Sequence, residues 1–137
     1  MKNKKKNAFT LIELLMVIAI LSILVSITIP RISSRKEEAK RMKALIQIQL
    51  YMQALEKYKL DNNNYPSTEE GLKILTNSSY LQAKTIPLDP WGAKYIYLSP
   101  GPDNTPYTII SFARDKENGG NGWDKDITSK DAEELIR

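Results

Sequence analysis

An acidic, glycine-rich stretch near the C-terminus, residues 112–127, carries the side chains best suited to chemistry. Asp115, Asp124 and Asp126 supply carboxylate oxygens, and the intervening glycines allow backbone carbonyls to turn toward a common centre. Oxygen ligands of this kind suit a hard cation such as Ca²⁺. The residues alone leave two alternatives open, a Ca²⁺ site and an ordinary polar surface loop. We refer to residues 112–127 as the acidic loop.

Glu13 is the second candidate, because it is the one ionisable side chain in the apolar run from Ala8 to Ile29. A helix over this run would be about 33 Å long, enough to cross a hydrocarbon core of about 30 Å. The apolar core of a cleaved secretory signal is shorter, usually about 7 to 15 residues. A carboxylate in a bilayer costs about 2.5 to 3.5 kcal/mol. Without a partner in its own helix, Glu13 must either reach the headgroups or pair with a positive group from another chain.

The composition excludes several classes of function. The sequence contains no Cys and no His, which removes disulfides, zinc-finger sites and mechanisms that use imidazole or a thiolate. No pair of nucleophile and base can be identified, so we expect no enzymatic activity. The formal net charge is +4, but four lysines lie within the first six residues. The basic stretch after Pro30 lacks interleaved aromatic residues, so we predict no nucleic-acid binding.

The charge is also unevenly distributed along the chain. Residues 31–59 are rich in basic side chains, whereas residues 103–134 are rich in acidic ones. This asymmetry suits head-to-tail packing of like subunits, although a solvated basic helix face is the simpler explanation of the charges alone. The lysines that precede the apolar run predict a cytoplasmic N-terminus, with residues 31–137 on the other side of the membrane.

The pattern after Pro30 predicts an α+β fold. A helix continues through the basic stretch and carries one apolar stripe, until turn-forming residues end it at 61–64. A short helix over 65–72 is predicted from a capping box, with Ser67 as N-cap and Glu70 three residues on. Strands near 94–98 and 107–112 should form a small antiparallel sheet. The stripe expected to cover this sheet consists of Ala44, Leu45, Ile48, Tyr51, Met52, Leu55 and Tyr58.

The segment from Lys4 to Leu14, KKKNAFTLIEL, closely resembles the class III signal of type IV pilins and pseudopilins. The resemblance implies that a prepilin peptidase cleaves between Ala8 and Phe9 and that the new amine of Phe9 is methylated. It also implies that Glu13 pairs with the amine of an adjacent subunit during assembly. Ala8 stands where the family usually has Gly, and Pro30 matches a position where the helix tends to kink. The chain would then comprise a cleaved leader (1–8), a transmembrane and filament-core helix (9–30) and a globular periplasmic part (31–137).

The remaining motifs, YPSTEEGL, PLDPWG, YIYLSPG and the acidic loop, resemble those of the major pseudopilins of type II secretion systems. The resemblance implies a pilin-like fold and a structural subunit that polymerises into a periplasmic pseudopilus to drive export of folded proteins. The implied partners are other copies of the chain, minor pseudopilins, the prepilin peptidase, the inner membrane and its assembly platform. The alternative is a type IV or competence pilin that serves adhesion, motility or DNA uptake.

The same resemblance bears on the acidic loop, because major pseudopilins bind one Ca²⁺ there. It implies Asp115, Asp124 and Asp126 as side-chain ligands, with the backbone carbonyls of Phe112 and Glu117 as further ligands. Arg114 and Lys116 flank the first aspartate and depart from the usual small residues. These two cations would weaken the affinity for Ca²⁺.

Overall fold

The computed structural model describes residues 9–77 and 80–136, with the backbone alone for residues 27–32. The predicted cleavage at Ala8 therefore lies at the edge of the described residues, and the leader lies outside them. The chain divides into two compact units, Met1–Lys36 and Glu37–Arg137. We call the second the head unit. The elements are α1 (Leu11–Asn62), α2 (Ile74–Asn77), β1 (Ile96–Leu98), η1 (Pro102–Asn104), β2 (Thr108–Ser111), η2 (Gly122–Asp124), β3 (Ile127–Thr128) and α3 (Ser129–Glu134).

Helix α1 ends at Asn62, within the turn-forming residues 61–64 that were predicted to end it. Asn63 adopts a left-handed φ of 64°, and its N–H donates to the carbonyl oxygen of Lys59 at 2.7 Å, which closes the helix. Helix α1 continues through Pro30, where the resemblance implied a kink. The boundary between the two units falls within α1, after Lys36. Over the part of the chain that the structure describes, no helix combines the length and the apolar character needed to cross a bilayer.

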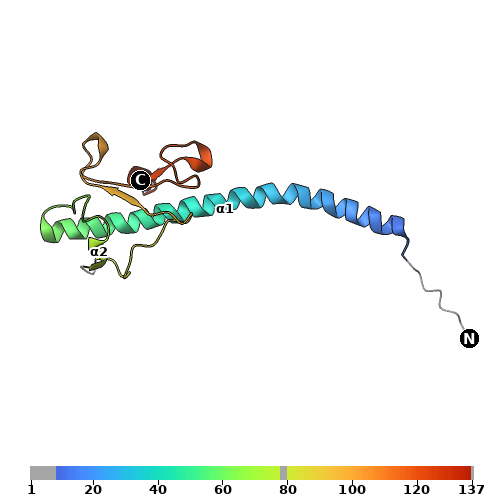
Figure 1. The fold of residues 1–137 in the computed structure, drawn as a ribbon, viewed down its shortest axis with the longest axis horizontal. Coiled ribbons are helices and arrows are strands. Elements are labelled where there is room, and N and C mark those ends of the chain that lie inside the picture. The colour runs from blue at the N-terminus through green and yellow to red at the C-terminus, as the bar shows by residue number, and fades with distance from the viewer. Residues whose placement is uncertain (1–8, 78–79, 137) are drawn as a thin grey trace, which may run out of the picture. The chain divides into compact units, whose positions relative to one another are not determined.

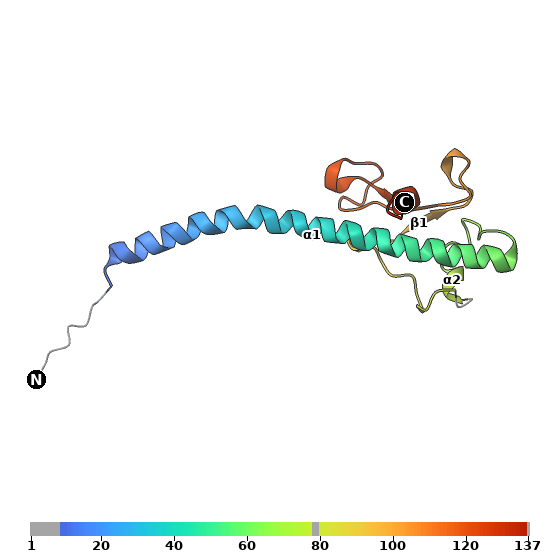
Figure 2. The ribbon, with the colours of Figure 1, turned by 180° about the vertical axis from the view of Figure 1, so that it is seen from behind.

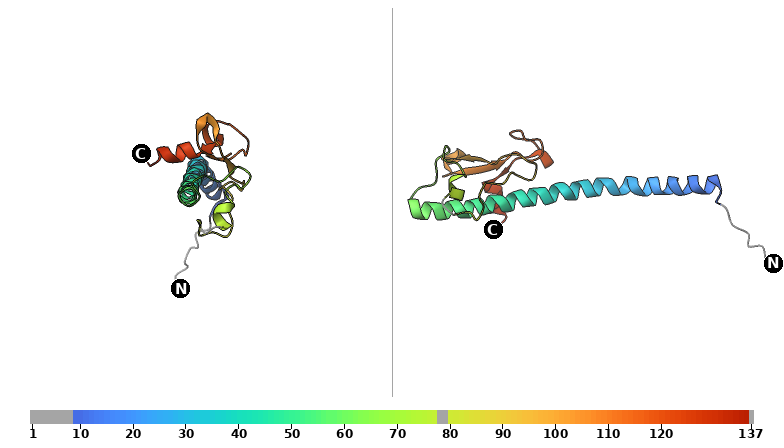
Figure 3. Two further views of the ribbon diagram at one scale, coloured as in Figure 1. Left: turned by 90° about the vertical axis from the view of Figure 1, so that its left-hand side faces the viewer. Right: turned by 60° about the horizontal axis from the view of Figure 1, so that its bottom comes forward.

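The core of the head unit forms where α1 meets the other elements, as the stripe predicted (Figure 1). Of the seven predicted residues, four are buried and three are partly buried against the same core. Viewed along α1, the sheet and α2 lie on different sides of the helix (Figure 3). The largest fully buried apolar side chains come from α1, α2, β2 and β3: Ile48, Leu55, Leu75, Ile109 and Ile127.

The sheet has three antiparallel strands in the order β1-β2-β3. Figures 1 and 2 show the region of the sheet from opposite sides. In β1 and β2, which confirm the predicted strands, Tyr97 pairs with Ile109. The third strand, β3, and α3 were not predicted. Thr128 ends β3 and caps α3 in a capping box with Asp131, whose carboxylate accepts from the Thr128 N–H at 2.8 Å.

The predicted helix over 65–72 is wrong in its position, although its capping box forms. The Glu70 carboxylate accepts from the Ser67 N–H at 2.8 Å, and Ser67 Oγ accepts from the Glu70 N–H at 3.3 Å. The chain there makes turns, and Gly71 adopts a left-handed φ of 58°, which interrupts the helical backbone. The helix in this region begins later, with α2 at Ile74.

A buried carboxylate holds the PLDPWG segment against the sheet. Asp89 is 4% exposed and accepts hydrogen bonds from the N–H of Trp91 at 3.0 Å and of Ala93 at 2.8 Å. Its second oxygen accepts from the hydroxyl of Ser111, at the end of β2, at 2.6 Å. The Asp89 carboxylate therefore accepts the hydrogen bonds of the N–H groups in a tight turn, and it also links this turn to β2, the central strand.

We predict that Asp89→Ala lowers the free energy of unfolding by about 3 kcal/mol, because two backbone N–H groups and the buried Ser111 hydroxyl lose their acceptor. Urea unfolding of the detergent-solubilised chain measures this. The neighbouring Leu88 is 52% exposed, so Leu88→Ala serves as the control and should change the stability by less than about 1 kcal/mol. Equal effects of the two substitutions would contradict the role of Asp89.

Candidate functional site

The first candidate site is the start of α1, where Glu13 belongs to a capping box. The Glu13 Oε2 atom accepts from the N–H of Thr10 at 2.9 Å and from its hydroxyl at 3.1 Å. In return, the Glu13 N–H donates to Thr10 Oγ1 at 3.3 Å. The expectation that Glu13 has no partner in its own helix is therefore wrong, since Thr10 is that partner. Phe9, the residue predicted to become the N-terminus, precedes this cap and is 84% exposed.

The second candidate site is the acidic loop, which connects β2 to β3. The loop closes on itself, because the Asp126 N–H donates to the Gly119 carbonyl oxygen at 3.0 Å and the Gly119 N–H donates to Asp126 Oδ2 at 2.9 Å. A bond from Arg41 Nη1 to the Lys125 carbonyl oxygen, 2.7 Å long, ties the loop to α1. Arg41 was not predicted as a functional residue, because nothing in the basic stretch distinguishes it from its neighbours.

The three predicted aspartates have different environments. Asp115 Oδ1 accepts from the N–H of Glu117 at 3.2 Å, within its own turn. Asp126 has one oxygen in the loop closure, whereas its Oδ1 is buried and has no hydrogen-bond partner. Within residues 9–77 and 80–136, no three acidic side chains are grouped closely enough to hold a metal ion. The structure thus does not gather the three carboxylates around one centre.

Asp124, the remaining aspartate, forms a bidentate ion pair with Arg114. Arg114 Nε lies 2.7 Å from Asp124 Oδ1, and Nη2 lies 2.9 Å from Oδ2. The hydrogen bonds from Arg114 lower the pKa of the Asp124 carboxyl below its ordinary value. The Arg114 guanidinium is therefore already paired with the aspartate that was expected to bind a metal ion. This pair was not predicted, because it depends on the loop bringing together residues ten positions apart.

Gly120 is the tightest point of the loop. Its φ is 78°, and a Cβ at this position would collide with the backbone carbonyl of Asp124. The adjacent Gly119 also has a left-handed φ, 105°, but a Cβ there would meet open space. Only a glycine at position 120 lets the two arms of the loop approach one another this closely.

We predict that Gly120→Ala lowers the free energy of unfolding by about 2 kcal/mol or more, through both backbone strain and the collision with Asp124. Gly119→Ala is the matched control and should cost about 1 kcal/mol, from the unfavourable φ alone. Urea unfolding compares the two variants. If Gly119→Ala costs as much as Gly120→Ala, the close approach has no energetic role.

Comparison with known proteins covers nearly the whole chain. Residues 3–29 match the model of the prokaryotic N-terminal methylation motif, and residues 31–130 match that of "Type II secretion system (T2SS), protein G". The type II secretion system core protein G of Vibrio cholerae is 38% identical over 92% of this chain and 92% of its own length. The protein of the same name from Aeromonas hydrophila is 43% identical over 87% of this chain and 90% of its own length.

A solved structure is also similar. The crystal structure of the major pseudopilin from the type 2 secretion system of enterohaemorrhagic Escherichia coli superimposes with a TM-score of 0.57. The two sequences are 31% identical, and the match covers 70% of this chain and 90% of that one. The similarity therefore extends from the sequence to the arrangement of the long helix and the small sheet.

Proposed function

Because the chain belongs to the type II secretion system protein G family, we propose that it is the major subunit of a periplasmic pseudopilus that drives export of folded proteins. The observation that carries this proposal is the match of residues 31–130 to protein G directly after a methylation motif at 3–29. The protein G match favours the secretion role over the alternative of a type IV or competence pilin. The role is that of a structural subunit without enzymatic activity.

In this proposal, the subunit is first inserted in the inner membrane. The lysines before the apolar run keep the N-terminus cytoplasmic, and residues 9–30 anchor the chain while the head unit is periplasmic. A prepilin peptidase removes residues 1–8 and methylates the amine of Phe9. The assembly platform and minor pseudopilins then act with further copies of this chain to build the polymer.

The capping box supports a specific way for Glu13 to act in assembly. Thr10 holds Oε2 of the carboxylate, and among the described residues Oε1 has no hydrogen-bond partner. A fixed carboxylate with one free oxygen can accept the ammonium that cleavage creates on Phe9 of a neighbouring subunit. The ion pair compensates the free-energy cost of placing a carboxylate in lipid. It therefore favours an arrangement in which the helices of neighbouring subunits are shifted relative to one another along their axes.

We predict that Glu13→Ala inserts into the membrane normally but fails to form pseudopili, because the amine of Phe9 on the neighbour loses its acceptor. Shearing and sedimentation of filaments from cells that overproduce the chain measure assembly. Intact-mass spectrometry of the membrane fraction measures loss of residues 1–8 and gain of one methyl group. Glu69→Ala removes a carboxylate from an exposed turn of the head unit and should leave filament yield unchanged. Normal filaments from Glu13→Ala would refute the ion pair.

We also propose that the acidic loop binds one Ca²⁺. Three features of the loop fit a cation: ligands that are all oxygen, a buried Asp126 oxygen without a partner, and a guanidinium that already neutralises Asp124. Asp124 and Asp126 would hold the ion, with Asp115 and the carbonyls of Phe112 and Glu117 as further ligands. Bound Ca²⁺ supplies charge neutralisation that fixes the loop on the head unit. Arg114 must release Asp124 for this, so the arginine competes with the metal.

We predict that Arg114→Ala binds Ca²⁺ more tightly than the unsubstituted chain but melts at a lower temperature in chelator, because the internal cation is lost. Thermal unfolding of the purified chain with chelator and with graded Ca²⁺ measures both effects. Lys116→Ala is the control, since Lys116 is the neighbouring cation and forms no ion pair with a described residue. Asp126→Ala should lose the response to Ca²⁺, and a full response in that variant would exclude Asp126 as a ligand.

A further inference from the structure

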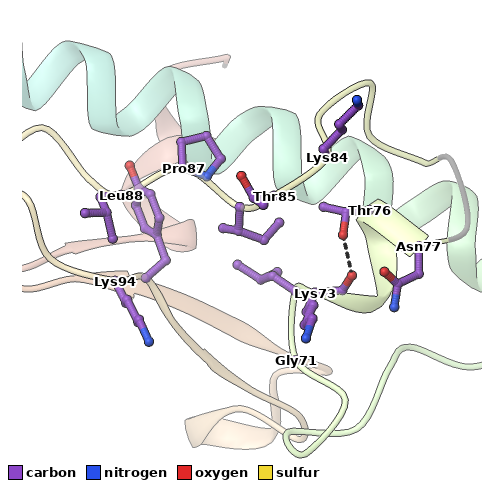
Figure 4. Close-up of a pocket in the computed structure, with 12 residues that line it drawn as sticks. Gly71, Lys73, Thr76, Asn77, Lys84, Thr85, Pro87, Leu88 and Lys94 are labelled. Atoms are coloured by element: carbon purple, nitrogen blue, oxygen red, sulfur yellow. Dashed lines mark hydrogen bonds between the residues drawn. The ribbon is translucent and has the colours of Figure 1, made fainter.

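A pocket in the head unit has an apolar interior and a basic margin. It has a volume of about 330 Å³ and lies between the α2 region and the segment over 84–88. Its interior includes the buried Leu72 and Tyr95 together with Leu88, which is 52% exposed. Figure 4 shows Pro87 and Leu88 among the residues that line the pocket, together with three lysines. An exposed apolar surface of this kind is a candidate for contact with another molecule.

The charge around the pocket is positive. Lys73, Lys84 and Lys94 line the pocket, and no Asp or Glu is among the residues that line it. All three lysines are exposed, and none lies within ion-pair distance of a carboxylate in the described part of the chain. The pocket therefore fits a ligand segment that joins apolar side chains to carboxylates.

The C-terminal segment of the same chain has this complementary chemistry. Glu133 and Glu134 end α3 and are exposed, and the next two residues are Leu135, 49% exposed, and Ile136, 69% exposed. The buried Ala132 and a bond of 3.0 Å from Gln49 Nε2 to its carbonyl oxygen fix the base of the segment on the head unit. Two carboxylates followed by two apolar side chains are thus presented to solvent from a fixed base.

The pocket and the C-terminal segment cannot meet within one head unit. In the end-on view of Figure 3, α2 lies on one side of α1, and α3, which leads into the C-terminal segment, lies on the other. A contact between them must therefore join two copies, and it uses a different surface on each copy. Contacts of this heterologous kind repeat without closing and generate open helical filaments.

We propose that the segment Glu133–Ile136 of one subunit docks in the pocket of the next subunit. Leu135 and Ile136 enter the apolar interior, while Glu133 and Glu134 face Lys73, Lys84 and Lys94 at its margin. The proposal rests on the polymeric function proposed above and adds a head-to-head contact to the contacts between helices.

The absence of cysteine in the chain allows a direct test by disulfide cross-linking. Leu88→Cys and Ile136→Cys are introduced together in the full chain, and assembled filaments are oxidised and separated on a non-reducing gel. Docking brings the two positions within the range of about 7 Å between Cα atoms that a disulfide requires. We expect a ladder of dimers, trimers and longer species, and no ladder from either substitution alone.

The matched control pairs Leu88→Cys with Leu60→Cys, because Leu60 is 80% exposed on α1 and belongs to neither surface. Equal cross-linking of the two pairs in intact filaments would overturn the docking and leave the polymer in place. Cross-linking of Leu88→Cys to a different protein would likewise overturn it, in favour of another occupant. If the unsubstituted chain forms no filament, both the polymeric function and the docking are wrong.

Exchange of the charges provides an independent measurement. Lys73→Glu with Lys94→Glu should lower filament yield about tenfold at low salt, as should Glu133→Lys with Glu134→Lys. All four substitutions together restore the attraction with its sign reversed, so the yield should return to within about twofold of the unsubstituted chain. A fourfold variant that assembles no better than either double variant would overturn the electrostatic pairing. Circular dichroism of each variant shows whether its fold is intact.

Discussion

Burial of one face of α1 is the interaction on which the rest of the head unit depends. The other elements are too short to be stable alone, since the strands have two to four residues and α2 and α3 have four and six. They gain stability by covering Ile48 and Leu55, which are completely buried. The short elements therefore form a single core only because they pack against α1.

Polar side chains of α1 complete this arrangement by fastening separate loops to the helix. Glu37 accepts from the indole N–H of Trp91 at 2.8 Å, and Gln47 accepts from the hydroxyl of Tyr95 at 2.7 Å. Arg41 and Gln49 donate to backbone carbonyls of the acidic loop and of α3. The apolar face determines that the loops lie on α1, and these bonds determine at which point along the helix each loop attaches. Both the acidic loop and the C-terminal segment gain a fixed position in this way.

The sequence was informative where a pattern repeats and uninformative where a position depends on tertiary contact. Helical spacing identified the buried stripe of α1, and the turn-forming residues around them delimited β1 and β2. The two residues of β3 are too few to show a period, and the capping box at Ser67 marked a turn rather than a helix because Gly71 follows. The acidic loop was recognised by composition, but the pairing of Arg114 with Asp124 depends on how the loop closes. The basic margin of the pocket comes from lysines on separate segments, so no local sequence motif indicates the pocket.

The hydrogen bonds that begin α1 have a consequence for maturation. Thr10 and Glu13 lie after the predicted cleavage point, so removal of residues 1–8 would take away none of the groups that start the helix. The groups that begin the helix consequently all lie in the part of the chain from Thr10 onward. Trimming would alter the charge at one end of a rod that is already formed, and the trimmed subunit could enter a filament without a refolding step.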